Sequence, residues 1–424
     1  MAISTSMSKE IRFCGSVDEA PSPPGAYVIA IELADERSPN AHVTLDCRTL
    51  IRDLAAYREP NSARSMFELM ITVVPFVLLW VLMWAALDAG YSIGLVLSVP
   101  AAGFLVRLFM IQHDCGHGSF FRRRSMNDWV GRVIGVLTPY DFWRRSHALH
   151  HASSGNLDHR GIGDIDTLTV REYSALPRWR QLLYRMYRHP VVMFGVGPAY
   201  LFILRHRLPM GLMRSGWQPW VSAMATNAAI AILVAAIIWL VGVGPFLLVH
   251  LPITLLAASL GVWLFYVQHQ FEDTFWEHND DWTFQEAALH GSSHYDLPGV
   301  LRWFTANIGV HHVHHLSSRI PYYRLPQVLR DHPQLAAVGR LTLLQSFRCV
   351  RMVLWDERRR RLISFREMHA VTSVTAWDEA VEIHGVCTEN LNPDVMVMEP
   401  AKDGVGIDDA GPLNRARDRR VFTQ

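Results

Sequence analysis

Four long apolar segments constrain the fold of this 424-residue chain more than any other feature of its sequence. They lie at about 69–87, 92–112, 219–241 and 246–268. A helix needs about 20 apolar residues to cross the hydrocarbon core of a bilayer, so each segment is long enough to span it. We therefore expect an all-α integral membrane protein with four transmembrane helices.

The four expected spans fall into two pairs. The short turns "DAGY" and "GVGP" join the first span to the second and the third to the fourth, so we expect two helical hairpins. Arg107 lies near the far end of the second span, where its side chain is expected to snorkel to the interface. Two shorter apolar runs, at about 129–142 and 190–204, leave two interpretations open: buried helices of a cap, or helices lying in the membrane interface.

The distribution of arginine predicts the orientation in the membrane. The two turns carry no Lys or Arg, whereas the other side carries Arg122, Arg123, Arg124, Arg144, Arg145 and the run 358–361. Positive residues stay inside, so we expect both termini and the long middle loop in the cytoplasm. Nearly all basic residues are Arg, which suggests a bacterial source and an inner-membrane location. The same arginines are open to a second interpretation, as a docking surface for an electron donor.

Polar segments flank the part that contains the spans. We expect a cytoplasmic N-terminal arm at 1–64, a catalytic or binding domain at 65–350, and a partly disordered cytoplasmic tail at 351–424. The first residues lack the apolar core of a signal peptide. Five scattered cysteines with no C-x-x-C predict neither a disulfide framework nor a structural zinc site. A net charge of +1 argues against a nucleic-acid-binding protein.

Histidine is concentrated in three short clusters, "HDCGH", "HALHH" and "HHVHH". The spacings are i and i+4 in the first cluster and i, i+3 and i+4 in the other two. The residues concerned are His113 and His117; His147, His150 and His151; and His311, His314 and His315. Such positions share one side of a helix, so each cluster can direct its imidazoles to a common point.

The expected topology brings the three clusters to the same side of the membrane. The first follows the second span, the second lies in the middle loop and the third follows the fourth span. Imidazole is a good ligand for iron, copper, zinc and nickel, and eight histidines exceed the needs of one ion, so we expect a di-metal site. His312 is off the repeated spacing and is not expected to be a ligand. His290 and His294 are expected at the surface, and His250 at the interface.

The three clusters, in this order around two pairs of spans, resemble the histidine boxes of the membrane-bound fatty acid desaturases. The resemblance covers about 65–350, which is therefore expected to be the desaturase domain, with a cytoplasmic helical cap that carries the metal site. The flanking strings "QHDCGHGSFF", "SHALHHASSGNLDHRGIGDIDTLTV", "VQHQFEDTFW" and "WFTANIGVHHVHHLSSRIPYYRL" resemble the bacterial acyl-lipid Δ12 or omega-6-like branch. The third box begins with His rather than Gln, which argues against the front-end branch.

This resemblance implies a non-haem di-iron centre that consumes O2 and two electrons for each cis double bond inserted into a fatty acyl chain. The nine implied iron ligands are His113, His117, His147, His150, His151, His269, His311, His314 and His315. The resemblance also implies that Asn307 holds a water near the metal. Asp114 is expected to orient a ligating imidazole. The sequence does not decide whether Asp158, Asp164 and Asp166 cap a turn or support the second box.

The electrons are expected to come from another protein. The chain has no G-x-G-x-x-G after a strand, no cysteine set for an iron–sulfur cluster and no fused haem module. This implies a ferredoxin or b-type cytochrome with its reductase, and an acyl substrate on a membrane lipid, coenzyme A or a carrier protein. A hydroxylase, acetylenase or carotenoid-modifying oxygenase remains an alternative. A membrane metal transporter is a more remote one, because it should carry ligands at mid-membrane depth.

Overall fold

The structure is a computed structural model that describes residues 28–32, 42–135, 139–161, 163–209 and 216–370. Contacts join the chain up to Met368 in one folded unit. The predictions for residues 1–27 of the N-terminal arm and 371–424 of the tail lie outside the described residues.

Four helices are long and apolar enough to cross a membrane, as the sequence predicts. They are α2 (Ser62–Asp88), α3 (Ser98–His117) with the preceding turn η2 (Ser92–Leu97), α9 (Gln218–Val241) and α10 (Val243–His269). Helix α2 begins earlier than predicted, because Asn61 caps it by accepting a hydrogen bond from the backbone N–H of Arg64. Glu68 therefore lies inside this helix.

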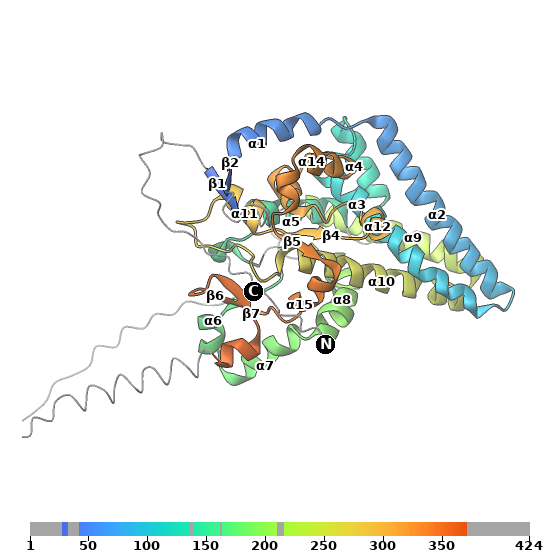
Figure 1. Cartoon of the computed structure of the whole chain (residues 1–424). Helices are drawn as coiled ribbons and strands as arrows, with labels where there is room; N and C mark the ends of the chain where they lie inside the picture. Colours follow the sequence, from blue (N-terminus) through green and yellow to red (C-terminus); the bar gives the residue numbers. More distant parts are fainter. Residues whose placement is uncertain (1–27, 33–41, 136–138, 162, 210–215, 371–424) are drawn as a thin grey trace, which may run out of the picture. The chain divides into compact units, whose positions relative to one another are not determined.

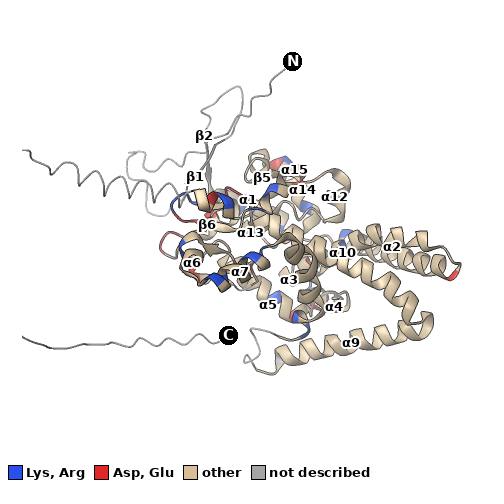
Figure 2. Ribbon diagram, turned by 90° about the horizontal axis from the view of Figure 1, so that it is seen from below, with Lys and Arg blue, Asp and Glu red and all other residues tan. Residues whose placement is uncertain are grey.

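Helix α3 packs against both α2 and α10, and α10 also contacts α9 (Figure 1). The apolar window of the α3 span is 44% buried, whereas that of α9 is 0% buried, so α9 leaves its apolar surface to the lipid. Figure 2 shows that the charged residues gather on the shorter helices and loops rather than along the spans. The spans that are most enclosed by protein, α3 and α10, are also the ones that end in His117 and His269.

The prediction that Arg107 snorkels to the interface is wrong. Its side chain is 2% exposed and forms an ion pair with Glu68, which is equally buried. Its Nε donates to Thr72 Oγ1 at 3.2 Å, and its guanidinium lies 4.1 Å from the ring centre of Trp303. A buried charge needs a partner, and Tyr322 also donates to Glu68, at 3.1 Å. The early start of α2 supplies this partner inside the protein.

Short helices make up most of the remaining structure. They are α1 (Cys47–Leu54), η1 (Ala55–Tyr57), α4 (Arg124–Val133), α5 (Tyr140–Ser153), η3 (Leu157–His159), α6 (Val170–Ala175), α7 (Arg178–Tyr187), η4 (Val192–Val196), α8 (Gly197–Ile203), η5 (Arg205–Arg207), α11 (Phe284–His290), α12 (Gly299–Phe304), α13 (His311–Leu316), η6 (Tyr322–Arg324), α14 (Leu325–Asp331), η7 (Pro333–Ala336) and α15 (Leu343–Cys349). The apolar run at 129–142 belongs to α4 and α5, and the run at 190–204 to η4 and α8.

Short strands correct the expectation of an all-α fold. In the described residues, β1 (Val28–Glu32) pairs with β2 (His42–Asp46), and β4 (His294–Asp296) with β5 (Arg340–Thr342). A third sheet joins β3 (Leu168–Thr169), β6 (Leu354–Asp356) and β7 (Arg361–Ile363). These strands hold two to five residues, too few for alternation to be visible in the sequence. Strands β6 and β7 show that the folded unit continues past residue 350, with Trp355 and Leu362 buried.

Candidate metal centre

All nine histidines singled out in the sequence come together, from the ends of α3 and α10 and from α5 and α13. They form two groups, and within each group the nitrogens that could bind an ion lie within 4.8 Å of one another. The five-histidine group is His113, His117, His147, His151 and His314. The four-histidine group is His150, His269, His311 and His315. Neither group includes a carboxylate or a cysteine.

Each H-x-x-H-H box is divided between the two groups, so the expectation that a box directs its imidazoles to one point is wrong. In α5, His147 and His151 belong to the five-histidine group and His150 to the four-histidine group. In α13 the i and i+4 residues belong to the four-histidine group and His314 to the other. An α-helix turns about 100° per residue, so i and i+4 diverge by about 40° and i+3 and i+4 by about 100°. The two boxes therefore connect the two groups.

The spacing of the inner nitrogens fits a metal ion better than a set of hydrogen bonds. The Nε2 of His311 lies 3.0 Å from that of His269 and 3.1 Å from that of His315. A neutral imidazole carries one N–H, so these contacts cannot all be good hydrogen bonds. Two imidazole nitrogens bound at right angles to one ion at about 2.1 Å lie about 3 Å apart.

The Nε2 atoms of the five-histidine group also have the spacing expected of ligands of one metal ion. The Nε2 atoms of His147 and His151 lie 3.1 Å apart, and those of His151 and His314 lie 3.2 Å apart. The Nε2 atoms of His113 and His117 are buried and have no hydrogen-bond partner among the residues that the structure describes. Buried polar atoms are nearly always paired, so two such atoms facing the same group indicate a place for a ligand. The residues present therefore fit a pair of metal ions.

Polar groups accept hydrogen bonds from the Nδ1 atoms of several of these histidines. His113 Nδ1 donates to Asp114 Oδ1 at 3.2 Å, and Asp114 also accepts the backbone N–H of Tyr322 at 2.8 Å. His269 Nδ1 donates to the carbonyl of Gly291 at 3.2 Å, a partner that could not be predicted from the sequence. A hydrogen bond at Nδ1 fixes the tautomer that leaves the Nε2 lone pair free for a metal.

The three aspartates that follow the second box have different surroundings. Asp164 accepts a hydrogen bond from His150 Nδ1, so it supports a histidine of the four-histidine group. Asp158 instead contacts His278 at 2.9 Å and accepts the backbone N–H of Asn279 at 2.9 Å, on the surface. Asp166 is exposed, and its backbone rather than its carboxylate is hydrogen-bonded to Tyr187. Of the three, Asp164 alone touches a clustered histidine.

Burial favours the neutral form of five of the clustered imidazoles. Five histidines of the two groups lie outside the spans and have a pKa well below the usual value of histidine. Burial is the main cause, and the neighbouring imidazoles lower the pKa further. The five are His147, His151, His311, His314 and His315. A metal binds imidazole in its neutral form, so the site favours the protonation state that a metal requires.

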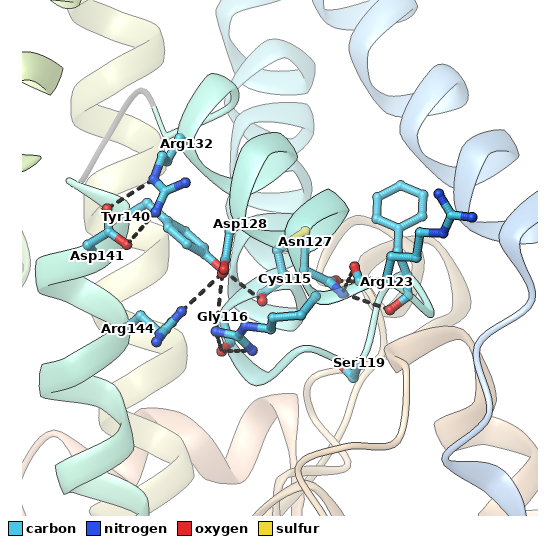
Figure 3. A network of polar contacts seen from close by, with 12 residues as sticks. Cys115, Gly116, Ser119, Arg123, Asn127, Asp128, Arg132, Tyr140, Asp141 and Arg144 are labelled. Carbon is cyan, nitrogen blue, oxygen red and sulfur yellow. Dashed lines mark hydrogen bonds and ion pairs between the residues drawn. The ribbon is translucent and has the colours of Figure 1, made fainter.

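A polar network at the corner of α3, α4 and α5 positions the second box against the first (Figure 3). Asp128 accepts hydrogen bonds from Tyr140 at 2.9 Å and from Arg144 at 3.0 Å, both on α5. Tyr140 Oη also lies 2.8 Å from the carbonyl oxygen of Cys115 on α3. Gly118, at φ 72°, ends α3 directly after His117 in a conformation that favours glycine. The sequence alone gave no sign of this network.

Three other histidines considered in the sequence lie away from the two groups. His312 is fully buried, and its Nε2 donates to the carbonyl of Leu335 at 2.9 Å. The surface position expected for His294 is wrong: it is buried in β4, where it donates to the Ala336 carbonyl, because pairing with β5 covers it. His250 lies in the N-terminal part of α10 and stacks on Phe246.

In the described residues, no contact joins the side chain of Asn307 to the clustered histidines. Its Nδ2 lies 3.4 Å from the carbonyl of Tyr322, and its φ of 56° lies in the left-handed region. Asparagine tolerates this conformation better than most residues, so the turn before the third box gives a conformational reason for its presence. A role for Asn307 near the metal remains a prediction. His290, at the end of α11, is half-buried.

Four candidate spans and two adjoining groups of histidines define a membrane-associated protein with a possible di-metal site. Residues 90–346 match the family model described as "Fatty acid desaturase". The chain belongs to the fatty acid desaturase family, and it is an oxidoreductase of fatty acid metabolism. Members of this family generally depend on iron.

Curated relatives agree with this assignment. A "Fatty acid desaturase" of Bacillus subtilis (strain 168) is 45% identical over 321 residues, which cover 75% of this chain and 91% of the relative. An "sn-1 acyl-lipid omega-3 desaturase (ferredoxin)" of Synechocystis is 34% identical and matches 51% of this chain and 61% of its own length. An "sn-1 oleoyl-lipid 12-desaturase" of the same organism is 30% identical over 52% of this chain and 63% of the relative. These relatives confirm the predicted family and include an acyl-lipid Δ12 type.

Proposed function

We propose that the chain inserts a cis double bond into a lipid-linked fatty acyl chain, using O2 and two non-haem iron ions held by the nine histidines. The observation that carries this proposal is the convergence of nine imidazoles, without a carboxylate, in two adjoining groups. The five-histidine group would hold one ion and the four-histidine group the other. Bound there, the iron pair would supply the binding and reduction of O2 and the oxidation of the acyl chain.

The protein contributes neutral ligands, fixed orientation and exclusion of water. Burial favours the uncharged form of five of the imidazoles, and Asp114, Asp164 and the Gly291 carbonyl hold three of the rings by hydrogen bonds to Nδ1. In the overall reaction one O2, two hydrogens from adjacent carbons, two electrons and two protons give one double bond and two waters. Regioselectivity would depend on how deeply the chain reaches past the histidines.

We propose that α2 with α3 and α9 with α10 form two hairpins, and that residues 65–350 make the desaturase domain with its cap in the cytoplasm. Helices α3 and α10 each carry a proposed ligand as their last residue, so they would end on one side of the membrane. The turns at 88–91 and 242–245 contain no Lys or Arg and would face the other side. Cytoplasmic termini follow from this arrangement, and we propose a bacterial inner membrane as the location.

An external electron donor completes the proposal. The Synechocystis omega-3 relative carries "(ferredoxin)" in its name, which favours a ferredoxin over a b-type cytochrome for this chain as well. The same relative is named for an acyl-lipid, and the other for an oleoyl-lipid, so a membrane lipid is the favoured carrier of the acyl chain. Asn307 is retained as a candidate for positioning water near the metal.

The test is a fatty-acid methyl ester profile of host membranes in which the chain is produced together with a ferredoxin and its reductase. We expect a new unsaturated ester that is absent when His147→Ala replaces the wild type, and fragmentation of its derivative locates the double bond. About two irons per purified chain would support the metal assignment. A hydroxylated or acetylenic product would show a related oxygenase reaction instead. No product from an iron-loaded chain with a working donor would contradict the proposal.

A further inference from the structure

Helix α7 (Arg178–Tyr187) exposes a stripe of large apolar side chains although it lies outside the four spans. The stripe consists of Trp179, Leu182, Leu183 and Met186, which are 53–59% exposed. The spacing i, i+3, i+4 and i+7 places these residues on one face of the helix. A continuous apolar face of this kind is unfavourable in water and usually marks an interaction surface.

The opposite face of α7 is fixed to the folded unit. The buried Tyr184 donates through its hydroxyl to the carbonyl of Val353 at 2.6 Å, and Gln181 donates to the carbonyl of Leu176 at 3.0 Å. Arg188, which caps the helix, is buried and donates to the hydroxyl of Tyr266 on α10 at 3.0 Å. These contacts prevent α7 from turning its apolar stripe inward.

The stripe is continuous with the surface of a spanning helix. After α7 the chain enters η4 and α8, and both pack against α10. Exposed apolar residues continue along this path at Val191, Val196, Tyr200 and Leu204. Because α10 is a candidate membrane span, the stripe extends the surface that meets the lipid.

The charges of α7 select among lipids. The helix contains Arg178, Arg180 and Arg185 and no acidic residue. Arg178 and Arg180 are exposed, and the guanidinium of Arg180 lies 5.0 Å from the ring centre of Trp179. Tryptophan and arginine together are typical of the headgroup region, where arginine favours anionic phosphates.

We propose that α7 is a membrane-surface helix that inserts its apolar stripe at the level of the lipid headgroups and binds anionic phospholipids through Arg178 and Arg180. The occupant of this surface is the bilayer. Since Arg188 ties α7 to Tyr266, three residues before His269, contact with the surface also fixes the depth of the histidine centre. The inference concerns membrane contact and does not depend on the proposed reaction.

Nitroxide depth measurements on the full chain in nanodiscs test the insertion. One label is placed at Leu183→Cys in the stripe and another at Ser174→Cys, an exposed polar position on the preceding helix α6, in a background that lacks the other reactive cysteines. We expect collisions with O2 to dominate at position 183 and collisions with a water-soluble nickel complex at position 174. Equal nickel access at the two positions would overturn the proposal. Protection of position 183 from both reagents would also overturn it, because the chain's own tail or a second copy would then cover the stripe.

Photoreactive lipids test the charge preference. Matched phosphatidylglycerol and phosphatidylcholine probes are incorporated in the nanodiscs, and their adducts within residues 176–190 are mapped by mass spectrometry. We expect an excess of phosphatidylglycerol adducts that falls at least about fivefold in the R178Q/R180Q variant. The control pair R52Q/R330Q, at exposed positions on α1 and α14, should leave the ratio unchanged. An unchanged ratio in R178Q/R180Q would refute selective binding of anionic lipid. Iron content is measured in parallel, so failure of the proposed di-iron site would be seen separately.

Discussion

The Nε2 atoms of His311 and His269 lie 3.0 Å apart, although the two residues are 42 positions apart in the chain. His269 is the last residue of the spanning helix α10, and His311 is the first residue of α13. The contact therefore links the end of a membrane span to the third histidine box. It gives His269 a place in the four-histidine group that no repeated spacing in the sequence could have assigned.

Replacing His269 with alanine should remove metal from the four-histidine group. Three imidazoles would remain there, and we expect about one iron per chain instead of two. Desaturation should fall by more than about 100-fold, since changes in the surroundings of metal ligands alone cost about 10- to 100-fold. Elemental analysis of the purified chain and the methyl ester profile measure the two effects.

His250→Ala is the matched control, because His250 lies on the same helix but stacks on Phe246 away from the two groups. Its iron content and product yield should equal those of the wild type. A His269→Ala variant that keeps both irons and full activity would remove His269 from the proposed ligands.

Asp164→Asn tests the support of the second box. The carboxylate accepts a hydrogen bond from His150 Nδ1, and the amide that replaces it is a weaker acceptor. We expect iron affinity to fall by about 10- to 100-fold, as measured by competition with a chelator. Asp158→Asn is the control, since Asp158 contacts His278 on the surface. Equal affinities for the two variants would show that Asp164 has no such role.

The grouping of the histidines could be predicted from the sequence because the information for it is local. Three short boxes, two of them with the same spacing, were placed by hydropathy on one side of the membrane, and this was sufficient to bring the histidines together. The division of the second and third boxes between the two groups was missed, because positions i+3 and i+4 of an α-helix point about 100° apart. The contact of His269 with the Gly291 carbonyl was missed, and the role of Asp164 beside the second box was left open, since both contacts depend on how loops fold back on the helices.

The fold was predicted less completely, for physical reasons. Spans are long and apolar, so their number and approximate positions follow from composition. The start of α2 was placed too late because Glu68 interrupts the apolar window, although its charge is compensated by Arg107 in the folded chain. The short strands carry no periodic signal, and their partners, such as Leu168 and Leu354, are far apart in the sequence.

The stability of the chain should decrease in acid through His206. Burial, assisted by Arg207 and Arg205, lowers the pKa of this histidine to about 3, whereas an unfolded histidine titrates near 6.5. Below about pH 6.5 the unfolded state therefore binds a proton that the folded state does not, and the free energy of unfolding falls as the pH falls. Above that pH the difference disappears.

His206→Phe should remove this acid sensitivity while it keeps the ring contact with Phe202. From about pH 7.5 to about pH 5, the wild type should lose up to about 2 kcal/mol more than the variant. Unfolding in mild detergent at the two pH values measures the difference. Exposed His159→Phe is the control and should follow the wild type. A His206→Phe variant with the same loss as the wild type would disprove the assignment.

Glu68 and Arg107 should be strongly coupled, because both side chains are buried between α2, α3 and the third-box region. Glu68→Gln leaves a buried guanidinium without its counter-charge, and we expect the free energy of unfolding to fall by about 3–5 kcal/mol. The double variant Glu68→Leu with Arg107→Met removes both charges, so most of that loss should be recovered. Arg64→Gln is the control: Arg64 pairs with the same carboxylate but is 53% exposed, so its loss should cost at most about 1 kcal/mol. A Glu68→Gln variant no less stable than Arg64→Gln would show that the pair is open to water, and thus that α2 does not enclose the charge as the structure indicates.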